Sequence, residues 1–248
     1  MGNLSNPGIN KETDRTRHIV STQNTLRESV KEVFQKDGSL AKVLEHYETR
    51  KSQQQMADSV AITATQGGTL LAEAGTGTGK TLAYLVPLIL NKQRVIISTG
   101  TKNLQEQIFF KDLPILQKIS SVPFTATMMK GRSNYLCRRR FEQYLSRTLI
   151  DREDALLLAK ILLWIDHTNT GDKSELNLTR KAHNILWNKL SAEGAGYCEI
   201  PTGRCFLRNA REAAGNSNLV ITNHSLLLAD IATAGAALPP YELLIIDE

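Results

Sequence analysis

The sequence lacks long hydrophobic runs, an apolar leader and a cysteine-rich framework. The longest apolar stretches, such as Thr81–Leu90, reach about half of the ~20 residues that a membrane-spanning helix needs, so we expect no membrane association. The first 30 residues are polar and contain no hydrophobic core of a secretory signal peptide. Three cysteines are too few, and odd in number, for a secreted disulfide scaffold. We therefore expect a cytoplasmic protein.

Acidic residues are fewer than basic ones, and the imbalance is local. The chain has 30 Lys and Arg against 25 Asp and Glu, and residues 120–215 hold 15 of the bases but only 10 of the acids. The whole surplus of five positive charges therefore falls within this internal segment. Clustered bases predict a polyanionic partner such as nucleic acid, although a solvated surface helix would give the same pattern.

Hydrophobic periodicity predicts an α/β fold. Helical spacing is found within residues 25–47 (with a break at Gly38), 53–65, 81–90, 102–117 and 154–166. Short apolar runs predict strands at residues 69–74, 95–98, 124–128, 219–222 and 243–247, and the last two are too continuously apolar to be half exposed. This alternation predicts a parallel sheet with helices on both faces.

The alternation of strands and helices stops in the middle of the chain. We expect residues 1–24 to form a flexible tail, and residues 25–129 to begin the sheet domain. Residues 130–214 are read as a mainly helical insertion that contains all three cysteines. Residues 215–248 then return to the sheet domain.

A glycine-rich loop, Ala74-Gly75-Thr76-Gly77-Thr78-Gly79-Lys80-Thr81, follows a predicted strand and opens a predicted helix. This context is typical of a phosphate-binding loop, although Ala74 replaces the first glycine of the strict pattern. Lys80 is expected to reach the β- and γ-phosphates of ATP, and the Thr81 hydroxyl to ligate Mg²⁺. The alternative is an ordinary glycine-rich turn. We expect the nucleotide to be bound by Gly75, Thr76, Gly77, Thr78, Gly79, Lys80 and Thr81.

Two acids end the last predicted strand, at Asp247 and Glu248. In nucleotide hydrolases the first acid at such a position holds the hydrated Mg²⁺, and the second orients or deprotonates the attacking water. The alternative is a strand that runs out into solvent. Together with the phosphate loop, the pair predicts that Lys80, Thr81, Asp247 and Glu248 serve catalysis.

Several further motifs occur in a fixed order around the phosphate loop. They are Arg50-x-x-Gln53-x-x-Met56, residues 98–107 (STGTKNLQEQ), residues 130–137 (KGRSNYLC), Trp164 with residues 170–172 (TGD), and residues 222–227 (TNHSLL). In this order they resemble the DinG/XPD type of superfamily 2 DNA helicases, and most closely the bacterial DinG/YoaA branch. The resemblance covers roughly residues 33–248 and implies a RecA-like motor domain.

The resemblance also implies roles for individual residues. Gln53, with Arg50 nearby, matches the adenine-recognition motif, although either could be a helix surface residue. Thr99, Gly100 and Thr101 match the motif that contacts the backbone of single-stranded DNA. The alternative for these three residues is a simple strand-to-helix turn with Thr101 as the N-cap.

The cysteines resemble the iron–sulfur insertion of the same family. Cys137, Cys198 and Cys205 match three ligands of a [4Fe–4S] cluster, but no cysteine occurs near residues 191–193, where the fourth is expected. Iron–sulfur clusters usually take four thiolates. A cluster, a zinc ion and three unrelated buried thiols therefore remain alternatives. His224, in the matching Thr-Asn-His segment, is expected to be a hydrogen-bonded structural histidine.

By this resemblance, the expected function is that of an ATP-dependent DNA helicase that moves 5′ to 3′ on single-stranded or forked DNA and belongs to DNA repair. The sequence stops at Asp247-Glu248, before the Ala and His of the family's DEAH box. The chain alone is therefore expected not to unwind DNA. Two alternatives are an inactive nucleotide- or DNA-binding fragment and a P-loop ATPase that acts on another kind of partner. No feature identifies protein partners.

Overall fold

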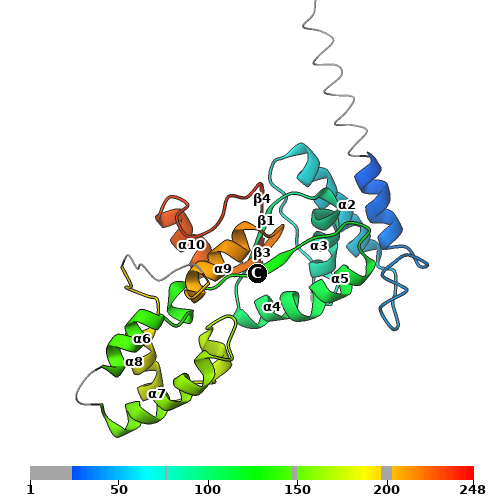
Figure 1. The fold of residues 1–248 in the computed structure, drawn as a ribbon. Helices are drawn as coiled ribbons and strands as arrows, with labels where there is room; N and C mark the ends of the chain where they lie inside the picture. The colour runs from blue at the N-terminus through cyan, green and yellow to red at the C-terminus, as the bar shows by residue number, and fades with distance from the viewer. Residues whose placement is uncertain (1–23, 76, 147–149, 197–202) are drawn as a thin grey trace, which may run out of the picture. The chain divides into compact units, whose positions relative to one another are not determined.

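The computed structural model describes residues 24–75, 77–146, 150–196 and 203–248 (Figure 1). The described chain has an α/β fold and divides into two compact units. The first unit holds the described residues up to Val95 together with Glu106–Thr125 and Tyr241–Leu244. The second holds Ile96–Gln105, Ala126–Pro240 and Ile245–Glu248.

The first unit is mainly helical. Its helices are residues 24–33, α2 (Lys51–Gln66), α3 (Lys80–Asn91), the π-helix η1 (Ile108–Asp112) and α5 (Leu113–Ile119). Helices α2 and α3 pack against each other, and α3 is buried from Ala83 to Ile89 because its sequence is apolar on every side. The first helix ends at Val33, five residues before the predicted break at Gly38, where a Cβ would lie 2.2 Å from the Glu32 carbonyl oxygen.

Four strands form one sheet in the order β2-β3-β1-β4, with the bounds β1 (Val95–Thr99), β2 (Ala126–Met128), β3 (Leu219–Asn223) and β4 (Leu243–Asp247). Strands β2 and β3 pair in parallel, with Thr127 opposite Val220. Strand β1 is buried along its whole length, as its β-branched sequence predicts. Within the second unit, α9 (Phe206–Gly215) packs on β2 and α10 (His224–Ala232) packs on β3.

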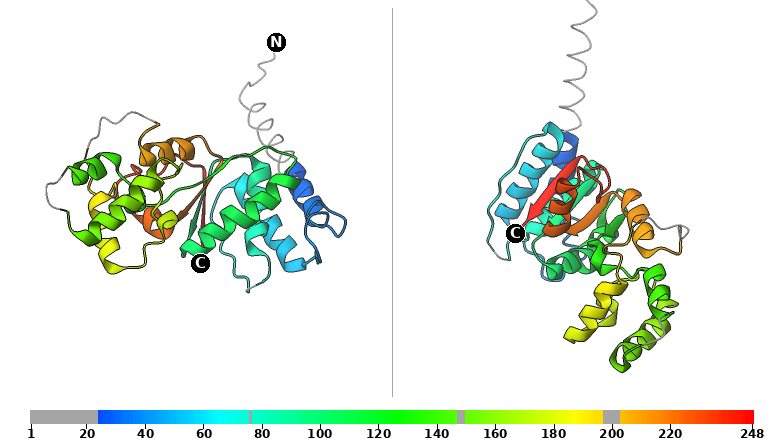
Figure 2. Two further views of the ribbon diagram at one scale, coloured as in Figure 1. Left: turned by 60° about the horizontal axis from the view of Figure 1, so that its bottom comes forward. Right: turned by 90° about the vertical axis from the view of Figure 1, so that its left-hand side faces the viewer.

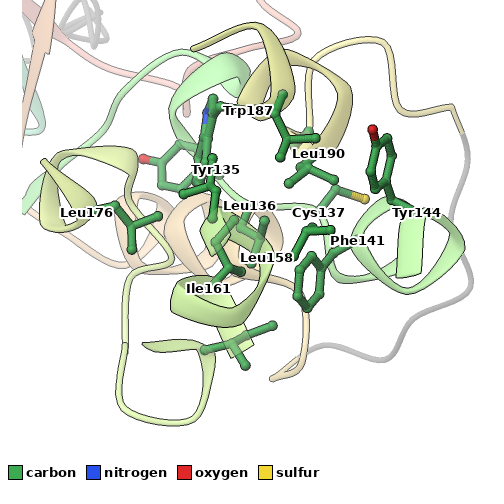
Figure 3. Packing of buried hydrophobic residues seen from close by; sticks show 14 of the residues in the cluster. Tyr135, Leu136, Cys137, Phe141, Tyr144, Leu158, Ile161, Leu176, Trp187 and Leu190 are labelled. Carbon is green, nitrogen blue, oxygen red and sulfur yellow. The ribbon is translucent and has the colours of Figure 1, made fainter. Parts of the chain in front are cut away.

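Between β2 and α9 the chain forms a helical segment, as predicted. It contains η2 (Arg132–Asn134), α6 (Arg138–Leu145), α7 (Arg152–Ile165), η3 (Lys173–Leu176) and α8 (Lys181–Leu190). Helix α8 packs on α6 and α7, and these green and yellow helices lie together in both views of Figure 2. Their shared apolar core centres on the fully buried Trp187, whose Nε1 donates to the Ser133 carbonyl at 2.7 Å (Figure 3).

Two sequence-based expectations about strands are wrong. Residues 69–74 were expected to form a strand, but they belong to no strand, and Leu71 is 93% exposed. Strand β4 forms but alternates between half-buried and exposed residues, with Ile246 67% exposed. This alternation shows that the described residues leave one face of β4 uncovered, and β4 is also an edge strand of the sheet.

The helix expected at residues 102–117 is present but not uniform. It comprises α4 (Lys102–Gln107), which begins in the second unit, followed by the π-helical turn η1 and by α5, where Pro114 occupies the first turn. Proline has no amide N–H to donate, so the regular hydrogen bond to the preceding turn is absent at Pro114, where the π-helical turn passes into α5.

Among the described residues, no helix is long and apolar enough to cross a membrane.

Asp112 ends the π-helical turn, and its Oδ2 is buried with no hydrogen-bond partner among the described residues. Burial raises the pKa of Asp112 to about 6, and the nearby Lys111 only partly opposes this. We expect Asp112→Asn to stabilise the protein at about pH 7 by on the order of 1 kcal/mol, after allowance for solvent screening of a partly exposed group.

The direction in which stability changes with pH follows from the raised pKa of Asp112. Between about pH 4 and pH 6 the native Asp112 carboxyl binds more protons than the unfolded one, so the stability of the unmodified protein falls as pH rises through this range. The advantage of Asn should therefore be small near pH 4 and complete above about pH 6. Urea unfolding at the two pH values measures it, with the exposed Asp166→Asn as control. Equal gains in the free energy of unfolding at both pH values would show that ionisation of the Asp112 carboxyl is not the cause.

Candidate functional site

The phosphate loop has the geometry of a turn that opens a helix. Helix α3 begins at Lys80, directly after Gly79, whose φ of 82° lies in the left-handed region that glycine favours. A Cβ at Gly79 would also lie 2.1 Å from the Gln53 Nε2, so close contact as well as φ requires glycine. The Thr78 hydroxyl donates to the Gly75 carbonyl at 2.8 Å. Thr76 lies outside the described residues.

The loop is also held from α2. The Gln53 amide is buried and donates to the Gly79 carbonyl at 3.0 Å, while the exposed Arg50 donates to the Gly77 carbonyl. Both residues therefore fix the backbone that would surround the phosphates. Their predicted contact with adenine stays a prediction.

Lys80 and Thr81 occupy the first turn of α3 and are half-buried, so their side chains are accessible. The first amide N–H groups of a helix have no partner within it and carry partial positive charge. A phosphate placed at this end would meet these donors and the Lys80 ammonium together. The loop can thus bind a polyphosphate by charge and by backbone hydrogen bonds.

A second group of predicted site residues gathers at the carboxyl ends of β1 and β4, in the second unit. His224, the first residue of α10, joins them: its Nδ1 hydrogen-bonds the Ser98 hydroxyl at 2.7 Å and its Nε2 the Glu248 carbonyl oxygen at 2.8 Å. The Gly100 amide donates to the Asp247 carbonyl at 3.2 Å. The backbone around the predicted catalytic carboxylates is therefore tied to the end of β1.

Within the predicted DNA-contact motif, the three residues differ in access. Thr99 is fully buried, and its hydroxyl donates to the carbonyls of Thr101 at 3.1 Å and Thr222 at 3.4 Å. Gly100 and Thr101 are exposed, and the Thr101 hydroxyl accepts a hydrogen bond from the Leu104 amide at 3.2 Å. Gly100 and Thr101 can meet a DNA backbone directly, whereas the Thr99 side chain supports the turn.

The phosphate loop belongs to the first unit, and Asp247 and Glu248 belong to the second. Asp247 is half-buried and Glu248 is exposed, so both carboxylates are accessible. Carboxylate oxygens are ligands that Mg²⁺ prefers. Their catalytic roles stay predictions.

Two of the three cysteines share one cavity of the helical segment. Cys137, buried in the apolar core shown in Figure 3, and Cys205, half-buried before α9, both line a cavity of about 180 Å³. Five arginines line the same cavity: Arg132, Arg138, Arg204, Arg208 and Arg211. Cys198 lies outside the described residues. The described part of the chain contains no group of three or more His, Cys, Asp or Glu side chains that could hold a metal.

This cavity fits an iron–sulfur cluster in part. Two thiols at one cavity can supply two ligands, and the arginines would balance the negative charge of a thiolate-bound cluster. A third ligand requires Cys198, and no fourth thiol exists in the chain.

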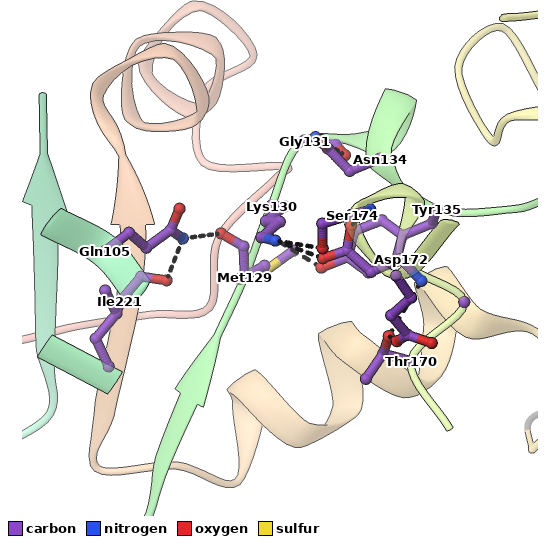
Figure 4. A network of polar contacts seen from close by, with 12 residues as sticks. Gln105, Met129, Lys130, Gly131, Asn134, Tyr135, Thr170, Asp172, Ser174 and Ile221 are labelled. Carbon is purple, nitrogen blue, oxygen red and sulfur yellow. Dashed lines mark hydrogen bonds and ion pairs between the residues drawn. The ribbon is translucent and has the colours of Figure 1, made fainter. Parts of the chain in front are cut away.

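Sequence reasoning missed a buried ion pair. The Lys130 ammonium lies 2.6 Å from Asp172 Oδ2, and both residues are buried (Figure 4). Lys130 and Asp172 each belong to a motif that resembles the helicase family, so both residues could be singled out from the sequence. Their pairing across 41 intervening residues could not be read from either motif alone.

Comparison with known proteins confirms the predicted resemblance. Residues 50–150 match the family described as DEAD/DEAH box helicase. The chain is 40% identical, over 85% of its length, to a Bacillus subtilis protein named 3′-5′ exonuclease DinG. It is 35% and 37% identical, in each case over 87% of its length, to the proteins named ATP-dependent DNA helicase YoaA of Haemophilus influenzae and Escherichia coli. The chain spans 23% of the first relative and 35% of each of the other two.

His224 provides a test of the strand-end cluster. In His224→Ala the fully buried Ser98 hydroxyl loses its ring partner, and an unsatisfied buried polar group costs about 1–3 kcal/mol. We expect a lower free energy of unfolding, measured by urea titration, whereas the half-buried His183→Ala should change it much less. The double change Ser98→Ala with His224→Ala should be less destabilising than the sum of the two single changes. Equal stabilities of the two histidine variants would contradict this role.

Proposed function

The chain carries a DEAD/DEAH box helicase domain of the DinG type, and we propose that it is the motor portion of an ATP-dependent DNA helicase. The observation that carries this proposal is the phosphate loop, which opens α3 within the matched residues 50–150. Two of the relatives are named ATP-dependent DNA helicases. The activity of a longer protein, its substrates and its partners are part of the proposal.

In this proposal the loop binds Mg-ATP. Lys80 contacts the β- and γ-phosphates, Thr81 ligates Mg²⁺, and Gln53 with Arg50 holds the loop and reaches the adenine. Asp247 would hold the hydrated Mg²⁺. Glu248 would orient the attacking water, and the His224 contacts support its position by fixing its backbone.

Single-stranded DNA is the proposed second ligand. The exposed Gly100 and Thr101 stand at the end of β1, where a phosphate backbone can approach closely. Movement 5′ to 3′, action on forked DNA and a place in DNA repair follow from the resemblance. We also propose residues 25–129 and 215–248 as motor domain 1, with residues 130–214 as its insertion.

DNA-stimulated ATP hydrolysis tests the helicase assignment against the two alternatives. A chain extended beyond residue 248 should hydrolyse ATP faster when single-stranded DNA is added. Hydrolysis that DNA does not stimulate would favour a P-loop ATPase with another partner. ATP binding without hydrolysis would favour a nucleotide-binding fragment.

Nucleotide binding by residues 1–248 can be tested directly with Lys80→Ala. The change removes a charge aimed at the phosphates, and hydrogen bonds to charged groups contribute ~1.5–3 kcal/mol, so Mg-ATP affinity should fall at least about tenfold. Isothermal titration calorimetry measures the affinity, with the exposed Lys118→Ala in the same unit as control. An unchanged affinity for Lys80→Ala would refute the phosphate-loop assignment.

We further propose that Cys137, Cys198 and Cys205 hold an iron–sulfur cluster. When bound, such a cluster supplies a covalent link between distant parts of the chain, because metal ligation is coupled to folding. Cys137 precedes α6 and Cys205 precedes α9, so the ligands would join the two ends of the helical segment. The arginine-lined cavity supports this proposal.

The cluster is expected only in protein purified without oxygen, because three thiolates leave one iron open to oxidation and loss. Cys137→Ser and Cys205→Ser should each abolish the bound iron and the visible absorption, and make the segment sensitive to protease. Ala192→Ser is the matched control, because it adds a hydroxyl to the same cavity and leaves the thiols intact. Colourless, iron-free anaerobic protein with a protease-resistant segment would show that the thiols are structural.

A further inference from the structure

Helix α7 is apolar on two opposite sides, but the described residues cover only one of them. The leucines and isoleucines that it buries in the core of Figure 3 are Leu157, Leu158, Ile161 and Ile165. Three other leucines are left in solvent: Leu156 is 68% exposed, Leu162 47% and Leu163 77%. A helix that is apolar all round is normally buried on every side. The second side of α7 is therefore a candidate contact surface.

The exposed leucines lie on one face of the helix. Successive residues of an α-helix are turned by about 100°, so Leu156, Leu162 and Leu163 all fall within ~60° of Ala159. Ala155 falls on the same face, and both alanines are exposed. We name these five residues the α7 stripe. All five side chains are apolar, so the favourable contact for the stripe is another apolar surface.

Opposite charges stand at the two ends of the stripe. Arg152 begins α7 and Asp166 directly follows its last residue, and both are exposed. Each is seven residues from Ala159, or about two helical turns, so each lies in line with the centre of the stripe. Lys160, the charged residue next to Ala159, is engaged elsewhere, since its ammonium donates to the Leu176 carbonyl at 2.6 Å.

Both end charges are unfavourably placed with respect to their own helix. The N-terminus of a helix carries partial positive charge and the C-terminus partial negative charge, so Arg152 and Asp166 each meet an end of like sign. An antiparallel neighbour reverses this relation, because its negative end lies beside Arg152 and its positive end beside Asp166. The charges thus suit a second helix that runs in the opposite direction.

The stripe also has the symmetry that a two-fold contact needs. Leu156 and Leu162 lie three residues before and after Ala159, and Arg152 and Asp166 lie seven residues before and after it. In a two-fold interface, a residue i that contacts j on the other copy is matched by j contacting i. An antiparallel pair centred on Ala159 would place Leu156 against Leu162 and Arg152 against Asp166, each twice. The small side chain of Ala159 at the crossing point permits a close approach of the two helices.

We propose that two copies of this chain associate through the α7 stripe, with the two α7 helices antiparallel and crossing at Ala159. This inference does not depend on the proposed function. Helix α7 has 14 residues and therefore a length of about 21 Å. Such a contact is smaller than the ~800 Å² per partner of a typical stable interface, so we expect a weak dimer with a dissociation constant above about 1 μM.

Sedimentation velocity of residues 1–248, at protein concentrations below and above the micromolar range, measures the association. Ala159→Glu places two like charges next to each other at the two-fold axis, so the dissociation constant should rise at least about tenfold. Because Ala159 is exposed, the variant should keep the fold, which urea unfolding checks. Ala213→Glu is the matched control and should leave the dissociation constant unchanged, because Ala213 is an exposed alanine of α9 outside the stripe.

Charge reversal tests the antiparallel pairing directly. Arg152→Asp and Asp166→Arg should each weaken self-association, because each sets like charges opposite one another in the dimer. An equimolar mixture of the two variants should associate again, since an acidic copy then faces a basic copy at both ends of the stripe. A purely structural role of either residue within its own chain would not be rescued by mixing.

Three results would overturn this inference. One is an unmodified chain that stays monomeric at every concentration. Another is a dimer that Ala159→Glu leaves intact, which would place the interface on a different surface. The third is a chain extended beyond residue 248 that is monomeric and protects α7 from hydrogen exchange as the dimer does, since another part of the same polypeptide would then cover the stripe. None of these results bears on ATP or DNA binding, which the proposed function assigns to other residues.

Discussion

The buried ion pair between Lys130 and Asp172 fixes the geometry of the helical segment. Lys130 stands two residues after the end of β2, and Asp172 directly precedes η3. A buried charge without its partner costs about 3–5 kcal/mol, so each residue constrains the other. Tyr135 joins the pair: its hydroxyl accepts the Lys130 amide at 3.0 Å, and burial raises the pKa of Tyr135 to about 12, with a smaller contribution from Asp172.

The ion pair also helps to position Cys137, through the residues that precede it in the chain. Tyr135 and Leu136 form isolated bridges to Asp172 and Ser191, and the Cys137 amide donates to the Leu190 carbonyl at 2.9 Å. A short extended stretch is thus held on one side by the η3 loop and on the other by the end of α8. Cys137 is the last residue of this stretch, so its position depends on contacts that begin at the ion pair.

The parts of the fold that sequence predicts well are those that local pattern determines. Strands β1 and β3 are β-branched and buried, and α7 buries apolar residues at helical spacing. The strand expected at residues 69–74 fails because a short apolar run does not specify a pairing partner. The exposed face of β4 could not be predicted either, because continuous apolar residues do not reveal a place at the sheet edge.

The candidate site likewise contains features that local sequence predicts and contacts that only the fold reveals. The phosphate loop is contiguous, so its glycines and Lys80 could be predicted from spacing alone. The contacts of Ser98 with His224 and of Lys130 with Asp172 join residues far apart in sequence, and only the fold brings them together. Gln53 is intermediate: its motif was visible, but its hydrogen bond to the Gly79 carbonyl required the packing of α2 beside the loop.

The structure also gathers part of the positive surplus of residues 120–215 in one place. Five arginines line the cavity of Cys137 and Cys205. At Arg138, protein groups satisfy the guanidinium only in part. Its guanidinium lies 4.7 Å from the Phe206 ring centre and donates to the Ile165 carbonyl, yet its Nε is buried without a partner among the described residues. Protonated thiols add no negative charge to such a cavity, whereas thiolates bound to a metal cluster do. The arginines would thus offset the negative charge of a thiolate-bound cluster, as proposed above for these cysteines.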